Sequence, residues 1–162
     1  MSQLLWYVAH TRPRREKKLA EYCLGKNLAV TLPCYRSALK YRGKTVVFQK
    51  PLFPSYLFVQ MTPENRGVVL QSDYTANLLD VSDQKLFARQ LGDVLLALET
   101  DLEIRLSPTI GEGARVKIKN GPLRGTEGWV EKRQGMSVVL LRLDFIGKAA
   151  AVKIAATDLE LI

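Results

Sequence analysis

The stretch QKPLFPSYLFVQ, Gln49 to Gln60, constrains the fold of this 162-residue chain more than any other segment. Alternation along a strand sends Tyr56 and Phe58 to one face and Leu57 and Val59 to the other, so both faces of the strand are apolar. One apolar face belongs to the core of the domain. The other face is either covered by helices or left for a partner, and this choice decides what the chain can do.

The segment before this strand predicts a strand, a helix and a hairpin. LLWYVAH, residues 4–10, is typical of a buried strand, and Pro13 suits the first turn of a helix over about residues 13–26. Positive side chains crowd the expected first turn, where they oppose the helix dipole. AVTLPCYRSALKY and TVVFQK then indicate two strands that turn at Gly43, which together form a basic hairpin.

The segment after the strand predicts two helices and one more strand. A short helix begins at Thr62 and Pro63, and ANLLDV, residues 76–81, indicates a strand. A helix capped by Ser82 or Asp83 follows and places apolar side chains at helical spacing, so we expect it to cover a sheet face. This order of elements predicts an α+β sandwich with an antiparallel sheet.

A change of pattern near Pro108 predicts a second domain. Beyond it the chain alternates apolar and polar residues in short runs separated by glycines, which is typical of a small β-barrel. We therefore expect an amino-terminal domain over residues 1–106, a linker over 107–113 and a barrel over 114–162.

The positive charge of the chain lies in one segment. Between residues 10 and 50 there are eleven Lys and Arg residues and two acidic residues, a charge of 11 − 2 = +9, so the rest of the chain sums to 8 − 9 = −1. Such a localised basic segment is expected where a surface meets phosphates. The alternative is a basic face that is merely solvated.

Composition excludes several classes of protein. A hydrophobic content of 47% indicates a globular chain, and no segment is typical of a signal peptide or a bilayer-spanning helix, so we expect a cytoplasmic protein. Cys23 and Cys34 have no CxxC spacing and the chain has one histidine, which favours buried free thiols over zinc or a disulfide. No cofactor and no metal are expected.

Catalysis is also not expected from the sequence. His10 could serve as a general base beside Arg12, but no nucleophile motif, metal-ligand cluster or phosphate-binding glycine loop accompanies it. A single histidine at a strand end is more often a contact residue, so we predict a protein that is not an enzyme.

Two motifs resemble those of one known family. WYVAHTRPRREKKLAE, followed by the basic hairpin and PLFPSYLFV, resembles the amino-terminal domain of the NusG family of transcription elongation factors. GARVKIKNGPLRGTEGWVEK resembles the KOW motif that ends those proteins, which implies an SH3-like barrel. The short length, the TRPR opening and the basic hairpin resemble the specialised paralogues of RfaH and UpxY type, which act in transcription antitermination.

The resemblance implies a surface for RNA polymerase. In that family the amino-terminal domain docks by an apolar depression on the clamp helices of the β′ subunit, reaches toward the β subunit and suppresses pausing. By position, the depression here would be lined by Trp6, His10, Phe53, Tyr56 and Phe58. Aromatic side chains around a shallow apolar patch with a basic rim suit a transient, specific interface.

The resemblance also implies a nucleic-acid surface. It would face the non-template strand or the upstream DNA duplex, and its contacts with phosphates would confer affinity and salt dependence without sequence choice. Its residues would be Arg12, Arg14, Arg15, Lys17 and Lys18, with Arg42 and Lys44 from the hairpin.

For the KOW domain the resemblance implies a protein partner. Phe145 and Ile146 fall where the family exposes an apolar loop to the ribosomal protein NusE or to Rho, which would couple transcription to translation. Their alternative place is the barrel core. We expect a monomer that does not bind membranes.

Another function remains open, a ribosome-associated or free RNA-binding KOW protein. It would need a basic barrel, but residues 108–162 carry nine basic and six acidic residues, 9 − 6 = +3.

The conformation of the second domain has two candidates. In RfaH the corresponding domain can form a helical hairpin that covers the polymerase site, and the alanines of GKAAAVKIAATDLELI favour helix. A helix through VKIKNGPLRGTEGW would however have to include Pro122, at about 3 kcal/mol, and three glycines at about 1 kcal/mol each. We therefore predict a β-barrel on a flexible linker, with the polymerase patch open.

Overall fold

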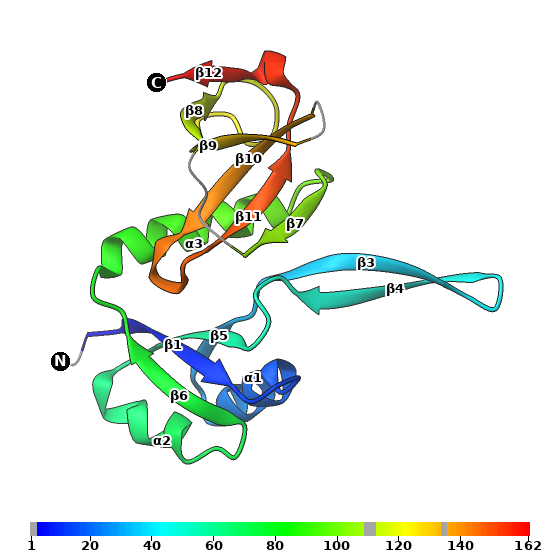
Figure 1. Cartoon of the computed structure of the whole chain (residues 1–162). Helices are drawn as coiled ribbons and strands as arrows, with labels where there is room; N and C mark the ends of the chain where they lie inside the picture. The colour runs from blue at the N-terminus through cyan, green and yellow to red at the C-terminus, as the bar shows by residue number, and fades with distance from the viewer. Residues whose placement is uncertain (1–2, 109–112, 134–135) are drawn as a thin grey trace. The chain divides into compact units, whose positions relative to one another are not determined.

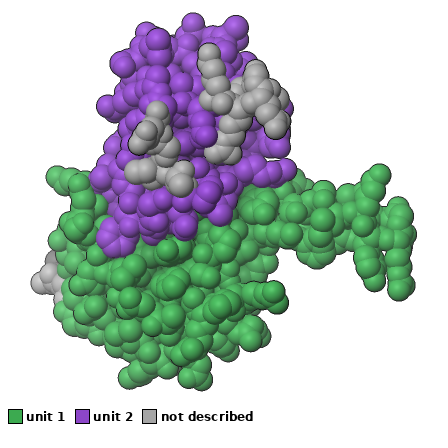
Figure 2. Space-filling view, viewed as in Figure 1, with its two compact units in different colours: residues 1–85 green, residues 86–162 purple. Residues whose placement is uncertain are grey.

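The computed structural model describes residues 3–108, 113–133 and 136–162. The chain divides into two compact units, residues 1–85 and 86–162 (Figure 2). We refer to them as unit 1 and unit 2 and describe each by itself.

Unit 1 is built on a four-stranded antiparallel sheet (Figure 1). The strand order is β2-β5-β1-β6, so the two most apolar strands occupy the centre. In the register of the central pair, Tyr7 lies opposite Val59 and His10 opposite Tyr56. The strands are β1 (Leu5–Thr11), β2 (Ala29–Thr31), β5 (Tyr56–Met61) and β6 (Thr75–Asp80).

Helices cover one face of this sheet. The core on that face is formed by alternate residues of β1 and β5, among them Ala9 and Leu57, and by Leu19 and Cys23 of α1 and Val69 of α2. The predicted alternation in β5 is confirmed, because Leu57 belongs to this core while Tyr56 and Phe58 belong to the opposite face. The helical elements are α1 (Glu16–Gly25), the 3₁₀ turn η1 (Pro63–Asn65) and α2 (Arg66–Leu70).

The first helix starts three residues later than predicted. Arg14 has a left-handed φ of 62°, which interrupts helical geometry, and Arg15 is the N-cap. Arg14 and Arg15 therefore precede the helix instead of opposing its dipole. Its first residue, Glu16, is buried, and its Oε2 accepts a hydrogen bond from the backbone N–H of Ser55 at 3.2 Å.

The predicted hairpin forms a separate two-stranded sheet, β3 (Cys34–Tyr41) and β4 (Lys44–Pro51). Arg42 and Gly43 both have positive φ, 51° and 76°, as a two-residue turn between right-twisted strands requires. At the other end the backbone N–H of Leu52 donates to Pro33 O at 2.8 Å. In Figures 1 and 2 the hairpin projects from the rest of unit 1.

Unit 2 combines most of α3 (Gln84–Leu98) with a six-stranded antiparallel sheet. The order β12-β8-β9-β10-β11-β7 leaves β12 and β7 as edges, so the described strands form an open sheet, and a closed SH3-like barrel stays a prediction. The strands are β7 (Ile104–Ser107), β8 (Ala114–Ile118), β9 (Glu127–Arg133), β10 (Met136–Leu143), β11 (Lys148–Lys153) and β12 (Leu159–Leu161), with 3₁₀ turns η2 (Asp144–Ile146) and η3 (Ala156–Asp158).

The carboxyl-terminal segment is built of strands, as predicted, and the alanine-rich run forms β11. Gly128 fits this arrangement because a Cβ there would lie 2.6 Å from Cγ1 of Val139, which is too close for any larger residue in β9. Gly147 turns the chain from η2 into β11 with a φ of 66°.

Two elements expected in the first domain have contacts in unit 2. Arg105, near the expected end of that domain, lies in β7, which pairs with β11 opposite Ala151. Phe87 and Gln90 of α3 contact the η2 segment. The contacts thus divide the chain after Lys85, whereas the linker was expected at 107–113, of which 109–112 lie outside the described residues. The division into domains at 1–106 and 114–162 stays a prediction.

Candidate functional site

The face of the unit 1 sheet opposite α1 and α2 carries aromatic side chains. By alternation Trp6, Val8 and His10 of β1 and Tyr56 and Phe58 of β5 share this face. His10 is exposed and Tyr56 is half-buried, and the centres of their rings lie 5.3 Å apart. This ring pair belongs to the accessible part of the predicted polymerase patch.

Phe53 and Phe58 lie deeper than expected. Their exposed fractions are 1% and 0%, and their rings meet edge to face with centres 6.3 Å apart. The family resemblance implies that both rings line a docking surface, but the structure buries them. The backbone N–H of Tyr56 donates to Phe53 O at 3.2 Å.

Trp6 is held by a residue that sequence analysis did not identify. The backbone N–H of Trp6 donates to Gln84 Oε1 at 2.6 Å, and Gln84 Nε2 donates to Trp6 O at 2.9 Å and to Val81 O at 3.1 Å. Gln84 is 78 residues away in the chain, so no local pattern predicts this contact. Trp6 itself is half-buried.

A β-bulge separates the aromatic patch from the basic loop that follows β1. The pairing of β1 with β6 shifts between His10 and Thr11. Beyond it, the backbone N–H of Arg12 donates to Tyr74 O at 2.9 Å, and its side-chain Nε donates to Asp73 O at 2.8 Å. The loop that follows is therefore anchored at its first residue.

All the predicted nucleic-acid residues are exposed in the structure. Lys17 Nζ donates to Gln49 O at 2.7 Å, which ties α1 to the base of the hairpin. At the hairpin tip, the guanidinium carbon of Arg42 lies 5.4 Å from the centre of the Tyr41 ring. The exposed residues are Arg12, Arg14, Arg15, Lys17, Lys18, Arg42 and Lys44.

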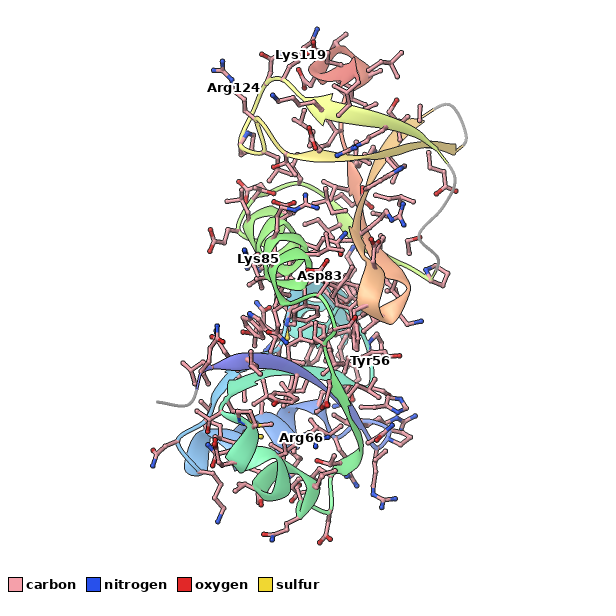
Figure 3. The ribbon with its side chains drawn as sticks, turned by 90° about the vertical axis from the view of Figure 1, so that its left-hand side faces the viewer. Tyr56, Arg66, Asp83, Lys85, Lys119 and Arg124 are labelled. Carbon is pink, nitrogen blue, oxygen red and sulfur yellow. The ribbon has the colours of Figure 1, made fainter. Side chains whose placement is uncertain are left out.

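In unit 2, Phe145 and Ile146 are half-buried in η2. The Phe145 ring meets Phe87 of α3 edge to face at 6.2 Å, and the backbone N–H of Asp144 donates to Gln90 Oε1 at 2.9 Å. The predicted partner loop is thus packed against α3. The KOW-like β8–β9 segment presents exposed Lys119 and Arg124 instead (Figure 3).

In unit 2, two arginines lie over the ring of Trp129. The guanidinium carbons of Arg142 and Arg115 lie 4.3 Å and 5.6 Å from its ring, and Arg115 pairs with Glu127 at 2.8 Å. These residues line a cavity with Asp93 of α3. The pKa of Asp93 is raised above its ordinary value, mainly because the carboxyl is partly buried. The positive charge of Arg89 opposes this shift, and the negative charge of Glu127 adds to it.

Cys23 is buried and Cys34 is half-buried. Burial raises the pKa of the Cys23 thiol to about 11, and it also raises the pKa of the Cys34 thiol, an effect that Lys17 opposes. Within the described ranges, no three metal-ligating side chains come together. In the same part of the chain, no helix combines the length and apolarity needed to cross a membrane.

Comparison with known families identifies the chain. A family model described as "Transcription termination factor nusG" matches residues 4–87, from β1 to the start of α3. This is more than half of the 162 residues. The chain belongs to the NusG family.

Relatives extend the likeness beyond unit 1. The transcription termination/antitermination protein NusG of Rickettsia conorii is 26% identical over 92% of this chain and 85% of its own length. The NusG of Lactococcus lactis is 24% identical over 96% and 91%. The solved structure of Thermotoga maritima NusG shares the fold, with a TM-score of 0.57, 18% identity and coverage of 99% and 98%. Both relatives are named transcription termination/antitermination proteins, and this NusG-family chain is similar to them over most of its length.

Proposed function

We propose that this NusG-family chain binds the clamp helices of the RNA polymerase β′ subunit with the sheet face opposite α1 and α2, and thereby suppresses pausing. The observation that carries the proposal is the pair of adjacent rings, exposed His10 and half-buried Tyr56, on that face. Two amphipathic rings give contact area at low entropic cost, and such rings are enriched at interface centres. Half-buried Trp6 completes the surface.

The basic loop and hairpin supply the second part of the proposal. Arg14, Arg15 and Lys18 are exposed beside the ring pair in sequence, and Arg42 and Lys44 occupy the hairpin tip. We assign them to phosphates of the non-template strand or upstream duplex, because such contacts give affinity that does not depend on sequence. Arg12 and Lys17 also donate hydrogen bonds to backbone carbonyls, so they fix the position of the loop in addition to giving it positive charge.

We further propose that residues 114–162, which lie in unit 2, form the KOW module. Its partner is the ribosomal protein NusE or Rho, which it contacts through Phe145 and Ile146. Lys119 and Arg124 are exposed on the β8–β9 segment of the same module. The specialised RfaH or UpxY type is supported by the TRPR opening and by the basic hairpin.

A pull-down of core RNA polymerase by the full-length protein tests the proposal. Tyr56→Ala and His10→Ala should weaken capture about 5- to 150-fold, which corresponds to about 1–3 kcal/mol of interface energy. The matched control is Leu24→Ala, an exposed apolar side chain on α1, on the other side of the sheet, which should not change capture.

If Tyr56→Ala and His10→Ala both capture RNA polymerase normally, this face of the sheet does not bind the clamp helices. Capture of ribosomes in place of polymerase would favour the RNA-binding KOW function instead.

A further inference from the structure

The hairpin of unit 1 has two chemically different faces. Residues directly opposite each other in an antiparallel pair share a face, and faces alternate along the strand. One face carries the pairs Tyr41–Lys44, Leu39–Val46, Ser37–Phe48 and Tyr35–Lys50. The other carries Lys40–Thr45, Ala38–Val47 and Arg36–Gln49. We call the first one the aromatic face, defined by Tyr35, Leu39, Tyr41, Val46 and Phe48.

The aromatic face is open to solvent to an unusual extent. The exposed fractions are 63% for Tyr41, 49% for Leu39, 46% for Phe48 and 36% for Val46. The hairpin is a sheet of its own that projects from the rest of unit 1 (Figures 1 and 2), so these side chains extend along an arm. A contiguous exposed apolar surface of this kind marks a binding site in a soluble protein.

The charge of the arm indicates what it binds. No acidic residue occurs between Glu21 and Glu64, a stretch that contains the whole hairpin. Two lysines belong to the aromatic face itself: Lys44 lies opposite Tyr41 near the tip, and Lys50 lies opposite Tyr35 near the base. Rings between cations, with no carboxylate, are complementary to a polyanion with flat apolar groups.

We propose that the aromatic face stacks unpaired bases of a single-stranded nucleic acid, while Lys44 and Lys50 contact its phosphates. The inference rests on the proposed nucleic-acid contact of the hairpin and specifies its ligand. Every base has a π face, so stacking on Tyr41 and Phe48 requires no particular sequence. Ser37 is the small residue opposite Phe48, which leaves room beside that ring.

The spacing of the side chains on the aromatic face favours a single-stranded nucleic acid over a duplex as the ligand. Side chains on one face of a strand repeat about every 6.8 Å, twice the rise per residue. Bases in a duplex repeat every 3.4 Å or so along each strand and stack on one another, so their faces are not available to protein rings. Bases that meet successive positions of the aromatic face must therefore be unstacked from each other. Unpaired DNA and RNA both meet this requirement.

Fluorescence anisotropy with the full-length protein tests the inference. The probes are labelled oligo(dT) and oligo(U) of about 12 nucleotides and a DNA duplex of the same length, each measured over a range of salt. Phe48→Ala and Tyr41→Ala should each weaken binding of a single strand about 5- to 150-fold. Tighter binding of oligo(dT) would identify DNA as the ligand, and tighter binding of oligo(U) would identify the transcript.

The chain offers a closely matched control. Val47 neighbours Phe48 in β4 and is equally exposed, at 49% against 46%, but lies on the other face. Val47→Ala should leave affinity unchanged. Phe48→Ala should keep the salt slope of the wild type, whereas Lys44→Gln should reduce it by about 0.7 because one phosphate contact is lost.

Three results would overturn the inference. The first is an equal loss of oligonucleotide affinity in Val47→Ala and Phe48→Ala. The second is tighter binding of the duplex than of either single strand. The third is unchanged oligonucleotide affinity in Phe48→Ala. If that last variant instead loses polymerase capture, the aromatic face docks on protein. The oligonucleotide assay uses no polymerase and the Tyr56→Ala pull-down uses no oligonucleotide, so failure of the inference and failure of the clamp assignment are distinguishable.

Discussion

Phe58 and Tyr56 are two residues apart on the same face of β5, yet the structure predicts opposite consequences of their loss. Phe58 is 0% exposed, lies opposite fully buried Val8 and packs its ring on Phe53. Removing a buried phenylalanine ring costs about 3–5 kcal/mol, of which the aromatic pair accounts for about 0.5–1.5. Tyr56 is half-buried and its ring partner His10 is exposed, so Tyr56→Ala should cost only about 1 kcal/mol.

Urea unfolding followed by circular dichroism separates the two cases. With a slope of about 2 kcal/mol per molar urea, Phe58→Ala should lower the unfolding midpoint by about 2 M and Tyr56→Ala by about 0.5 M. Tyr56→Ala should nevertheless capture polymerase more weakly than the wild type while it is fully folded.

A loss below about 1 kcal/mol for Phe58→Ala would refute the reasoning, because a ring that contributes so little to stability is not part of a packed core. Such a result, combined with lost capture, would return Phe58 to the docking surface expected from the sequence.

Three further predictions concern charge and burial. Charge reversal at Arg14 and Arg15 should reduce suppression of pausing and flatten its salt dependence; an unchanged salt response in a pause assay would contradict this. The pKa of Asp93 is raised above its ordinary value of 3.8 in the folded protein, so the folded state binds the proton more tightly than the unfolded state. The free energy of unfolding therefore falls as the pH rises from 3.8 through the raised pKa. Asp93→Asn should abolish that fall and raise the free energy of unfolding at pH 7, measured by urea titrations at several pH values. At pH 8, a thiol reagent should modify Cys34 before Cys23, which should react only on unfolding.

Much of the candidate site follows from local patterns. Alternation in YLFV assigns Leu57 to the helix-covered face and Tyr56 to the other, and the structure agrees. The two strands around Gly43 and the strand–helix order of unit 1 also follow from the sequence. These features depend on residues close together in the chain, where the side-chain period of a strand and the turn preference of glycine act without help from distant segments.

Other features depend on contacts between distant residues. The start of α1 was misplaced because the left-handed Arg14 and the buried Glu16, which bonds Ser55 39 residues away, override the preference of Pro13 for a first helical turn. The sequence does not predict the role of Gln84 for the same reason, because its side-chain amide forms hydrogen bonds with the backbone of Trp6, which lies in another element.

By itself, the sequence determined which faces of the strands are apolar and where positive charge gathers, because periodicity and composition are properties of neighbouring residues. Only the tertiary structure decided which apolar rings are core and which are accessible. Phe58 and Tyr56 are equivalent in the strand pattern, and they differ only in what the rest of the chain packs against them. Burial is a sum over long-range contacts, so it cannot be read from spacing along one strand.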